Sequence, residues 1–346
     1  MASIETLLNS PSMAAVLKFL LIAYFCLVGV ARADAPIILR FSHVVAPDTP
    51  KGKAADFFAR RAFEATGGRV KVEVFPNSQL FKDREELEAL QLGTVQMLAP
   101  SLAKFTPLGV KGFEVFDLPY IFENEDKLHR ITQGTIGRNL LQGLESRGIL
   151  GLAYWDNGFK QMSANRPLHL PADFKGLKMR VQGSRVLEAQ MRALGAQAVS
   201  MDFSEVYRAL RAGVVDGTEN PVSNLYTQHM HEVQKYLTLS NHGYLGYAVI
   251  VNRRFWDDLP RDLRRALETA LAEATQFAND IARKENQEAL ARVKAAGLTQ
   301  VFELTAAERV EWKKALVQVH RQMETRIGRD TIQAIYRETG FNPEKP

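Results

Sequence analysis

Short apolar segments alternate with amphipathic segments along most of this chain of 346 residues. The apolar segments are typical of strands, and the amphipathic segments, several of which stop at a glycine, are typical of helices. The connections between them are short, which favours parallel strands, because parallel pairing requires a crossover that a helix can supply. We therefore expect an α/β protein. The length suits two α/β lobes of roughly 100–200 residues each.

The expected strands cover residues 37–41, 70–75, 95–99, 149–154, 177–181, 198–201 and 247–251. The expected helices cover residues 50–65, 83–92, 136–147, 184–194, 202–212 and 260–296. A further helix is expected to begin at the capping box Thr305-Ala-Ala-Glu308. Residues 216–221 are predicted to form a polar turn. No low-complexity linker separates two halves, so two lobes would be joined by structured crossovers.

The amino terminus carries the pattern of a secretory signal. Lys18 precedes an apolar run of 13 residues, 19–31, and Ala31-Arg32-Ala33 follows it with small residues at both positions that signal peptidase reads. The run is too short for a transmembrane helix, which needs about 20 apolar residues. We expect a signal peptide over residues 1–33, cleaved near Ala33 or Ala35, and a periplasmic protein. The alternative is a buried amino-terminal helix.

Composition and the absence of standard motifs exclude several classes of function. The one cysteine, Cys26, lies in the predicted signal, so the mature chain would have no disulfide and no thiolate catalyst. The basic residues that give the net charge of +5 are scattered, which argues against a nucleic-acid-binding tail. There is no G-x-S-x-G, no phosphate-binding loop and no G-x-G-x-x-G, and His231-Glu232 lacks the second histidine of a zinc helix because Lys235 stands there. We expect no enzyme, no metal and no cofactor.

Cations and amides near strand ends are the remaining candidates. In the strand 177–181, Lys178 and Arg180 alternate with apolar residues, and Gln182 continues their face. An arginine on an edge strand is commonly a surface charge, and Asn220 in a polar turn commonly satisfies its own backbone. The residues alone leave these alternatives open.

Several stretches together resemble a known family. They match, in order and over essentially the whole mature chain, the periplasmic binding proteins of TRAP transporters, and most closely the DctP type, which binds C4-dicarboxylates. The stretches are FSHVVAPDTPKG at 41–52, VFPNSQL at 74–80, FDLPY at 116–120, KMRV at 178–181, FSEVY at 203–207 and NHGYLGY at 241–247.

The resemblance implies two α/β lobes around a ligand cleft, joined by strands and by one long helix, a role that residues 260–296 fit. On that basis we expect residues 36–157 plus 246–285 to form lobe I and residues 158–245 plus 286–346 to form lobe II. The resemblance also implies capture of succinate, malate or fumarate and delivery to a permease of one small and one large membrane subunit. We expect a monomer that binds no nucleic acid.

The family's carboxylate-binding arginine falls on Arg180 and its partner amide on Asn220. The chemistry agrees, because an arginine fork matches a carboxylate with two parallel hydrogen bonds and an asparagine can add a donor. Sialic-acid-binding relatives carry a second arginine, an acidic residue and an early asparagine where this chain has Lys160, Ser101 and Val44. These differences argue against sialic acid.

A dicarboxylate needs positive groups at both ends, and Lys51, His43 and Lys160 are the candidates for the second end. Trp155 and Tyr244 are expected to wall the pocket. Each has an ordinary alternative: the lysines as surface charges, the aromatic residues as core, and the histidine as a hydrogen-bonded strand residue.

Three other functions stay open at this stage. The chain could bind a different organic acid. It could act as a periplasmic co-sensor that reports dicarboxylates to a membrane histidine kinase. A periplasmic hydrolase is the third alternative, which incubation of substrate with the protein would test.

Overall fold

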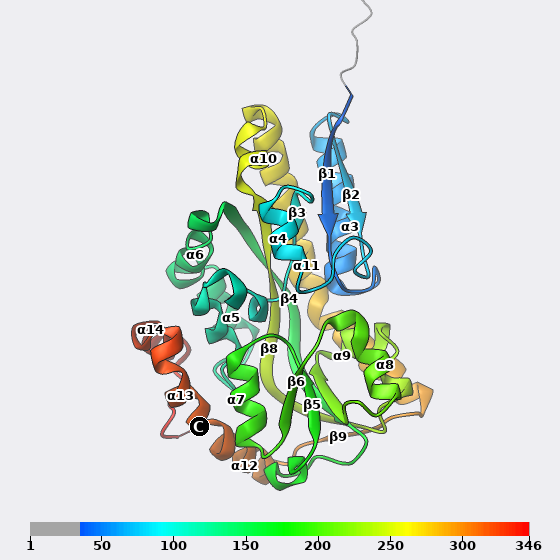
Figure 1. Cartoon of the computed structure of the whole chain (residues 1–346), viewed down its shortest axis with the longest axis vertical. Helices are drawn as coiled ribbons and strands as arrows, with labels where there is room; N and C mark the ends of the chain where they lie inside the picture. The colour runs from blue at the N-terminus through cyan, green and yellow to red at the C-terminus, as the bar shows by residue number, and fades with distance from the viewer. Residues whose placement is uncertain (1–34, 346) are drawn as a thin grey trace, which may run out of the picture. The chain divides into compact units, whose positions relative to one another are not determined.

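The computed structural model describes residues 35–345, and the predicted secretory signal lies outside them. From Ile37 onward the chain packs as one compact unit built on a mixed sheet, in the order β2-β1-β3-β8-β4-β7-β5-β6, with β9 paired to β8 (Figure 1). The strands are β1 (Ile37–Ser42), β2 (Val70–Phe75), β3 (Met97–Leu98), β4 (Ile149–Ala164), β5 (Lys178–Val181), β6 (Gln197–Ser200), β7 (Gly217–Asn220), β8 (Tyr236–Asn252) and β9 (Gln300–Glu303).

The long strands β4 and β8 form the centre of the sheet and pair antiparallel along most of their length. β3 pairs with the carboxyl-terminal part of β8, while β7 pairs with the carboxyl-terminal part of β4 and β9 with the amino-terminal part of β8. The outer strands pair in parallel as predicted, β1 with β2 and β3, and β5 with β6, and β5 also pairs in parallel with β7. The sheet thus has two parts that share only β4 and β8.

Most of each central strand was absent from the sequence prediction, which placed strands within them only at 149–154 and 247–251. The register between β4 and β8 shifts between Asp156 and Gly158 and again between Lys160 and Met162. These bulges interrupt the alternation that identifies a strand.

The predicted polar turn at 216–221 is wrong. Residues Gly217–Asn220 form strand β7, which is buried throughout and lies between β4 and β5. The segment is polar although it is interior, because its side chains reach the charged and amide groups described below.

The helices are α3 (Pro50–Ala65), α4 (Glu86–Gln91), α5 (Glu125–Thr132), α6 (Thr135–Gln142), α7 (Arg185–Ala193), α8 (Val206–Arg211), α9 (Val222–Thr227), α10 (Arg253–Asp258), α11 (Arg261–Ala296), α12 (Ala306–Leu316), α13 (Gln318–Ile327) and α14 (Arg329–Thr339). The predicted long helix is confirmed as α11, which starts after Pro260 and ends at Gly297 in the left-handed conformation. The capping box before α12 is also confirmed, since the Thr305 hydroxyl accepts from the Glu308 amide at 3.2 Å.

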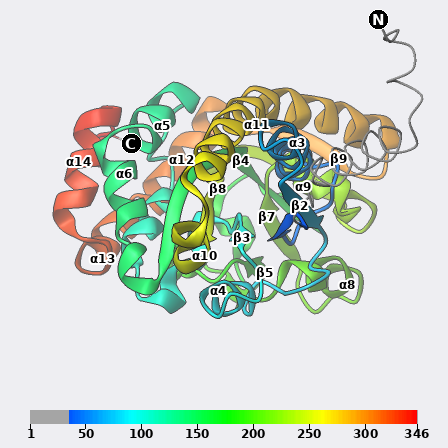
Figure 2. The same ribbon diagram turned by 90° about the horizontal axis from the view of Figure 1, so that it is seen from above.

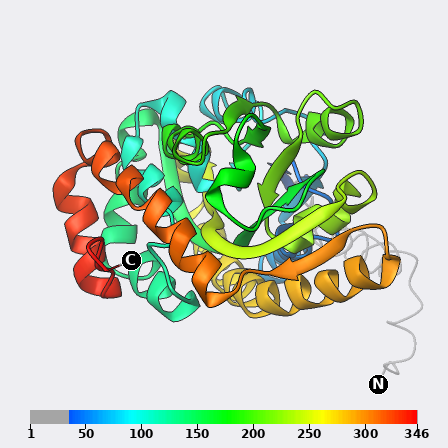
Figure 3. The ribbon, with the colours of Figure 1, turned by 90° about the horizontal axis from the view of Figure 1, so that it is seen from below.

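Helix α11 packs against α3, β4 and α9, and so contacts elements beside both parts of the sheet (Figure 2). One core lies under α3 and α11 around Phe41, Phe58 and Trp155, and another lies between α8, α9 and the end of α11. Seen from below, β9 runs beside β8, and α12 to α14 follow it along the edge of the molecule (Figure 3). Within residues 35–345, none of the helices combines the length and the apolar character required to span a bilayer.

Candidate ligand cleft

The parallel strands of both parts of the sheet direct polar residues toward one region. Arg180 and Gln182 lie at the carboxyl end of β5, and Met201 directly follows β6. Carboxyl ends of parallel strands are the usual ligand-binding edge of an α/β sheet. A cavity of about 560 Å³ lies there, and α4 and the 3₁₀ turns that follow β3 form its other side. It is lined by Asp83, Arg84, Leu87, Glu88, Gln91, Lys104, Pro107, Leu108, Arg180, Gln182, Gly183, Ser200, Met201 and Asp202.

Arg180 is only 1% exposed, which excludes the alternative that it is a surface charge. Its Nε and Nη2 donate to the Met201 carbonyl at 3.2 and 2.8 Å, and its guanidinium lies 5.7 Å from the centre of the Phe203 ring. Burial lowers the pKa of Arg180, and the carboxylates of Asp83 and Glu219 oppose that effect. These contacts fix the plane of the guanidinium and leave Nη1 as a donor for a ligand.

Asn220 shares a face of the sheet with Arg180. The parallel register places Arg180 opposite Thr218. Residues two positions apart on a strand share a face, so Gln182 and Asn220 continue the same surface. The Asn220 Oδ1 accepts from Asn224 at 3.4 Å, while its buried Nδ2 has no acceptor among the described residues. A buried donor without an acceptor is costly, so this amide is suited to binding a ligand oxygen.

Lys51 is buried at the start of α3 and is therefore not a surface charge either. Its Nζ donates to the Ala99 carbonyl at 2.9 Å and lies 3.8 Å from the centre of the Tyr247 ring. Burial and the charge of Lys104 lower the pKa of Lys51 to about 7. The ammonium has three donors, so Lys51 can still bind an anion.

His43 follows β1 and is 1% exposed, and neither ring nitrogen has a partner among residues 35–345. Burial, together with the nearby Lys51, lowers the pKa of His43 to about 3, so the imidazole is neutral near pH 7. The buried Tyr247 hydroxyl likewise has no partner in the described chain.

Ser101 connects the Lys51 side of the cleft with the Arg180 side. It forms an isolated bridge with Tyr247, and its hydroxyl accepts from the Gln182 side-chain amide at 2.9 Å. The position that the resemblance singled out therefore lies between the two groups of donors and carries no charge of its own.

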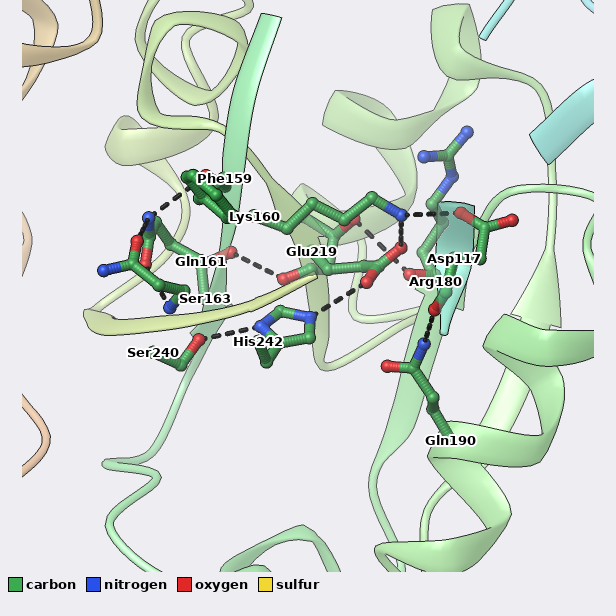
Figure 4. A network of polar contacts seen from close by, with 12 residues as sticks. Asp117, Phe159, Lys160, Gln161, Ser163, Arg180, Gln190, Glu219, Ser240 and His242 are labelled. Carbon is green, nitrogen blue, oxygen red and sulfur yellow. Dashed lines mark hydrogen bonds and ion pairs between the residues drawn. The ribbon is translucent and has the colours of Figure 1, made fainter. Parts of the chain in front are cut away.

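Lys160 has its charge neutralised by the protein. Its Nζ lies 2.8 Å from Glu219 Oε1 and 3.5 Å from Asp117 Oδ1, and His242 binds the other Glu219 oxygen at 3.0 Å (Figure 4). Burial alone would raise the pKa of Glu219, but Lys160 and His242 together lower it to about 2. Lys160 thus lies in a buried ion-pair network, on the other face of β4 from Gln161, the residue paired with Asn220.

Trp155 and Tyr244 belong to hydrophobic cores. The Trp155 indole is fully buried and donates to Thr275 of α11 at 2.9 Å. The Tyr244 hydroxyl donates to Asp156 at 2.6 Å, and its ring meets Phe122 edge to face. Neither residue lines the cavity described above, and of all the predicted site residues only Arg180 does.

The predicted site did not include Tyr247, Gln182 and Lys104. The alternation along 177–181 had placed Gln182 on the polar face of Arg180, but Gln182 was not assigned to the site. Lys104 forms ion pairs with Asp83 and Glu86, the latter at 3.3 Å, so a second buried lysine beside Lys51 is already neutralised. No spacing in the sequence connects these three residues.

The arrangement is suited to holding anions. Arg180, Asn220, Lys51 and Tyr247 are buried and present donors, and each has at least one donor hydrogen that no described acceptor takes. Among residues 35–345, no three His, Cys, Asp or Glu side chains gather closely enough to hold a metal ion.

Comparison with known proteins agrees with this arrangement. A family model described as bacterial extracellular solute-binding protein, family 7 (DctP), matches residues 41–326. The chain is 64% identical over 300 residues to the C4-dicarboxylate-binding periplasmic protein DctP of Rhodobacter capsulatus, covering 87% of this chain and 90% of that protein.

Two solved structures share the fold closely. A TRAP periplasmic solute-binding protein of Shewanella oneidensis with bound succinate matches with a TM-score of 0.86 and 43% identity, over 88% of this chain and all of that one. One from Pseudomonas aeruginosa with bound L-malate matches with a TM-score of 0.81 and 45% identity, over 83% of this chain and all of that one.

Proposed function

Since the chain belongs to the bacterial extracellular solute-binding proteins of family 7, the DctP family of TRAP periplasmic binding proteins, we propose that it captures C4-dicarboxylates such as succinate, malate and fumarate. Members of this family are solute-binding proteins and not enzymes. The captured diacid is delivered to the small and large membrane subunits of a TRAP transporter, and the protein acts as a monomer.

The observation that carries this proposal is the pair of donor groups at the cleft. Arg180 and Asn220 bind one carboxylate, with Met201 holding the guanidinium in place. Lys51 and Tyr247 bind the second carboxylate, with neutral His43 beside them. Two separated sets of buried donors are what a short diacid requires, because each of its charges must find hydrogen bonds when it leaves water.

The other predicted residues act indirectly in this proposal. Ser101 holds Gln182 between the two carboxylate sites. Lys160 positions Glu219, the neighbour of Asn220 on β7. Trp155 and Tyr244 support β4 and β8 from behind the cleft rather than walling it.

Closure of two lobes completes the mechanism. We assign residues 36–157 plus 246–285 to lobe I and 158–245 plus 286–346 to lobe II, which move about β4, β8 and α11. Ligand binding favours the closed arrangement because only there do both sets of donors reach one molecule.

A thermal-shift panel tests the ligand class. Succinate, malate or fumarate at about 100 times the Kd should stabilise the folded protein by about 2.7 kcal/mol, whereas sialic acid and neutral sugars should leave the melting temperature unchanged. A clear shift with a monocarboxylate and none with any C4-diacid would contradict the proposal.

Export to the periplasm is the second part of the proposal, supported by the Lys18 start, the apolar run at 19–31 and the alanines before Asp34. Intact-mass measurement of the periplasmic protein should give a mature amino terminus at Asp34 or Pro36. Recovery of a soluble protein that retains residues 19–31 would overturn this assignment.

A further inference from the structure

A second cavity, of about 440 Å³, lies away from the ligand cleft and shares no lining residue with it. Its walls come from the segment before and within α5, from α12, from β8, and from the end of α14 and the residues after it. The charged residues in its lining are the cations Lys127, Arg309, Lys313 and Lys345 and the single acid Glu123. The cavity therefore carries a marked excess of positive charge.

Two of these cations retain donors for a ligand. Lys313 makes no ion pair or side-chain hydrogen bond within residues 35–345, and its Nζ lies 5.7 Å from the centre of the Tyr120 ring. Arg309 Nη1 donates to the Ser240 carbonyl at 2.9 Å, while the nearest carboxylate to Nη2 is the exposed Glu303 at 3.7 Å. Lys127 differs, because its ammonium already binds the Thr339 carbonyl.

Tyr120 supplies an independent observation. Its φ is +58°, a left-handed conformation that costs energy for a bulky residue. Its main-chain amide donates to the His242 carbonyl at 2.9 Å, which holds the strained residue in place. Tyr120 lines the cavity, and its hydroxyl is buried and has no partner in the described chain. Backbone strain and an unpaired buried donor each occur often at binding sites, and Tyr120 combines the two.

We propose that this cavity is a second anion site, which takes a small, multiply charged oxyanion of the phosphate or polycarboxylate class. Lys313, Arg309 and the Tyr120 hydroxyl donate to its oxygens. An oxyanion fits better than a neutral ligand, because it satisfies the Tyr120 donor and offsets the excess positive charge at once. The site does not depend on the function proposed for the cleft.

Isothermal titration calorimetry tests the proposal with inorganic phosphate and with citrate as probes, on the mature protein at low ionic strength. We expect saturable binding of at least one probe. The probe that binds more tightly shows whether the site prefers phosphates or polycarboxylates. The double variant Arg309→Gln/Lys313→Gln should weaken that binding at least tenfold, and Tyr120→Phe should weaken it severalfold. Arg180→Ala should leave it unchanged, because Arg180 belongs to the other cavity.

Lys314→Gln is the matched control, since Lys314 neighbours Lys313 on α12 but is exposed and paired with Glu311. If the double variant is unstable by circular dichroism, Lys313→Gln alone serves, because it breaks no described polar contact. Absence of binding of both probes to the wild-type protein would overturn the proposal. So would equal weakening by Lys314→Gln, or loss of binding in Arg180→Ala with retention in the double variant.

Discussion

The buried cations of the cleft differ in whether the protein already neutralises them. Lys160 and Lys104 each face two carboxylates, whereas Arg180 and Lys51 donate to backbone carbonyls and form no ion pair in the described chain. A carbonyl orients a cation without cancelling its charge. An anionic ligand therefore gains more from Arg180 and Lys51 than from the other two, and substitutions there should affect binding most.

Arg180→Ala should weaken succinate binding strongly. Removing one partner of a buried charge pair costs roughly 2–5 kcal/mol, which corresponds to between about 30-fold and several thousand-fold in Kd. Arg180→Lys should also be damaging, because an ammonium cannot reproduce the planar fork. Calorimetric titration of each folded variant measures the effect.

Lys178→Ala provides the matched control, since Lys178 lies two residues away on β5 but is exposed. It should bind succinate as the wild type does. If Arg180→Ala binds its diacid within about threefold of wild type, Arg180 does not belong to the site, and the assignment of Asn220 falls with it.

Lys51 should make succinate binding depend on pH. Its pKa in the free protein is about 7, and a carboxylate beside it favours the protonated form. Binding should therefore take up a proton, and affinity should fall above about pH 7, by at most about tenfold per pH unit.

The free energy of unfolding should change with pH in the opposite direction, because the same Lys51 ammonium titrates. Because the folded pKa lies below the ordinary value of 10.5, its contribution to stability increases as pH rises from about 7 toward that value.

Titrations between about pH 6 and about pH 9, in buffers of different ionisation enthalpy, measure this proton uptake. Lys51→Met should bind weakly and lose the pH dependence that this lysine causes. Lys53→Met, a change two residues along α3 at a partly exposed lysine paired with Glu285, should retain it. Proton uptake that persists in Lys51→Met would assign the titration to another group.

The sequence placed Arg180, Asn220, Ser101, Lys51 and His43 in the candidate site, through motif resemblance rather than spacing. It selected Tyr244 where the structure brings Tyr247 to Lys51. These two tyrosines lie three residues apart on β8, and an odd separation places side chains on opposite faces of a strand. Both faces of β8 are buried, so hydrophobicity could not decide between them.

At the scale of elements, the long helix α11 and the outer parallel strands followed from periodicity and stop signals, because they have a regular polar or apolar side. The centre of β4 could not be predicted from periodicity or stop signals. Residues Asp156-Asn157-Gly158 look like a turn, yet they lie within a strand at a shift in its register with β8. Asn286 of α11 donates to the Asn157 carbonyl at 2.6 Å, an interaction over 129 positions that no local pattern predicts.

Gly158→Ala should destabilise the protein at this contact. Gly158 has φ +139°, and a Cβ there would lie 2.7 Å from Asn286 Nδ2. The variant therefore adds backbone strain and displaces the amide that ties α11 to β4. We expect a loss of about 1–3 kcal/mol in the free energy of unfolding, measured by urea denaturation.

Gly176→Ala isolates the contribution of the contact. Gly176 also has a positive φ, +78°, but a Cβ there meets nothing within 4 Å. Its cost should be smaller than that of Gly158→Ala. Equal losses in the two variants would mean that the Asn286 contact contributes nothing beyond backbone strain.

At the scale of the whole molecule, three long elements run between the regions on either side of the cleft: β4, β8 and α11. Helices α13 and α14 also pack against α5 and residues 111–117. The cores under α3 and around α8 and α9 belong to different parts of the sheet, whereas a third core includes Leu87 and Phe113 together with Val186 and Val319, from both proposed lobes. Movement of the two parts about the bulged strands and the helix would therefore rearrange this shared core. The sequence could not reveal this connection, because most of each central strand lacked a strand pattern.

Closure about these three connections predicts a change in size on ligand binding. The donors of Lys51 and Tyr247 and those of Arg180 and Asn220 lie in different proposed lobes, so one short diacid can contact all four only if the lobes are close together. Small-angle X-ray scattering of the mature protein should therefore give a smaller radius of gyration with saturating succinate than without it. Arg180→Ala, at a succinate concentration that saturates the wild type but lies below the raised Kd of the variant, should scatter like the free protein, because its site stays mostly empty. Wild-type profiles that are identical with and without succinate, at a concentration shown by calorimetry to saturate the site, would contradict closure by lobe movement.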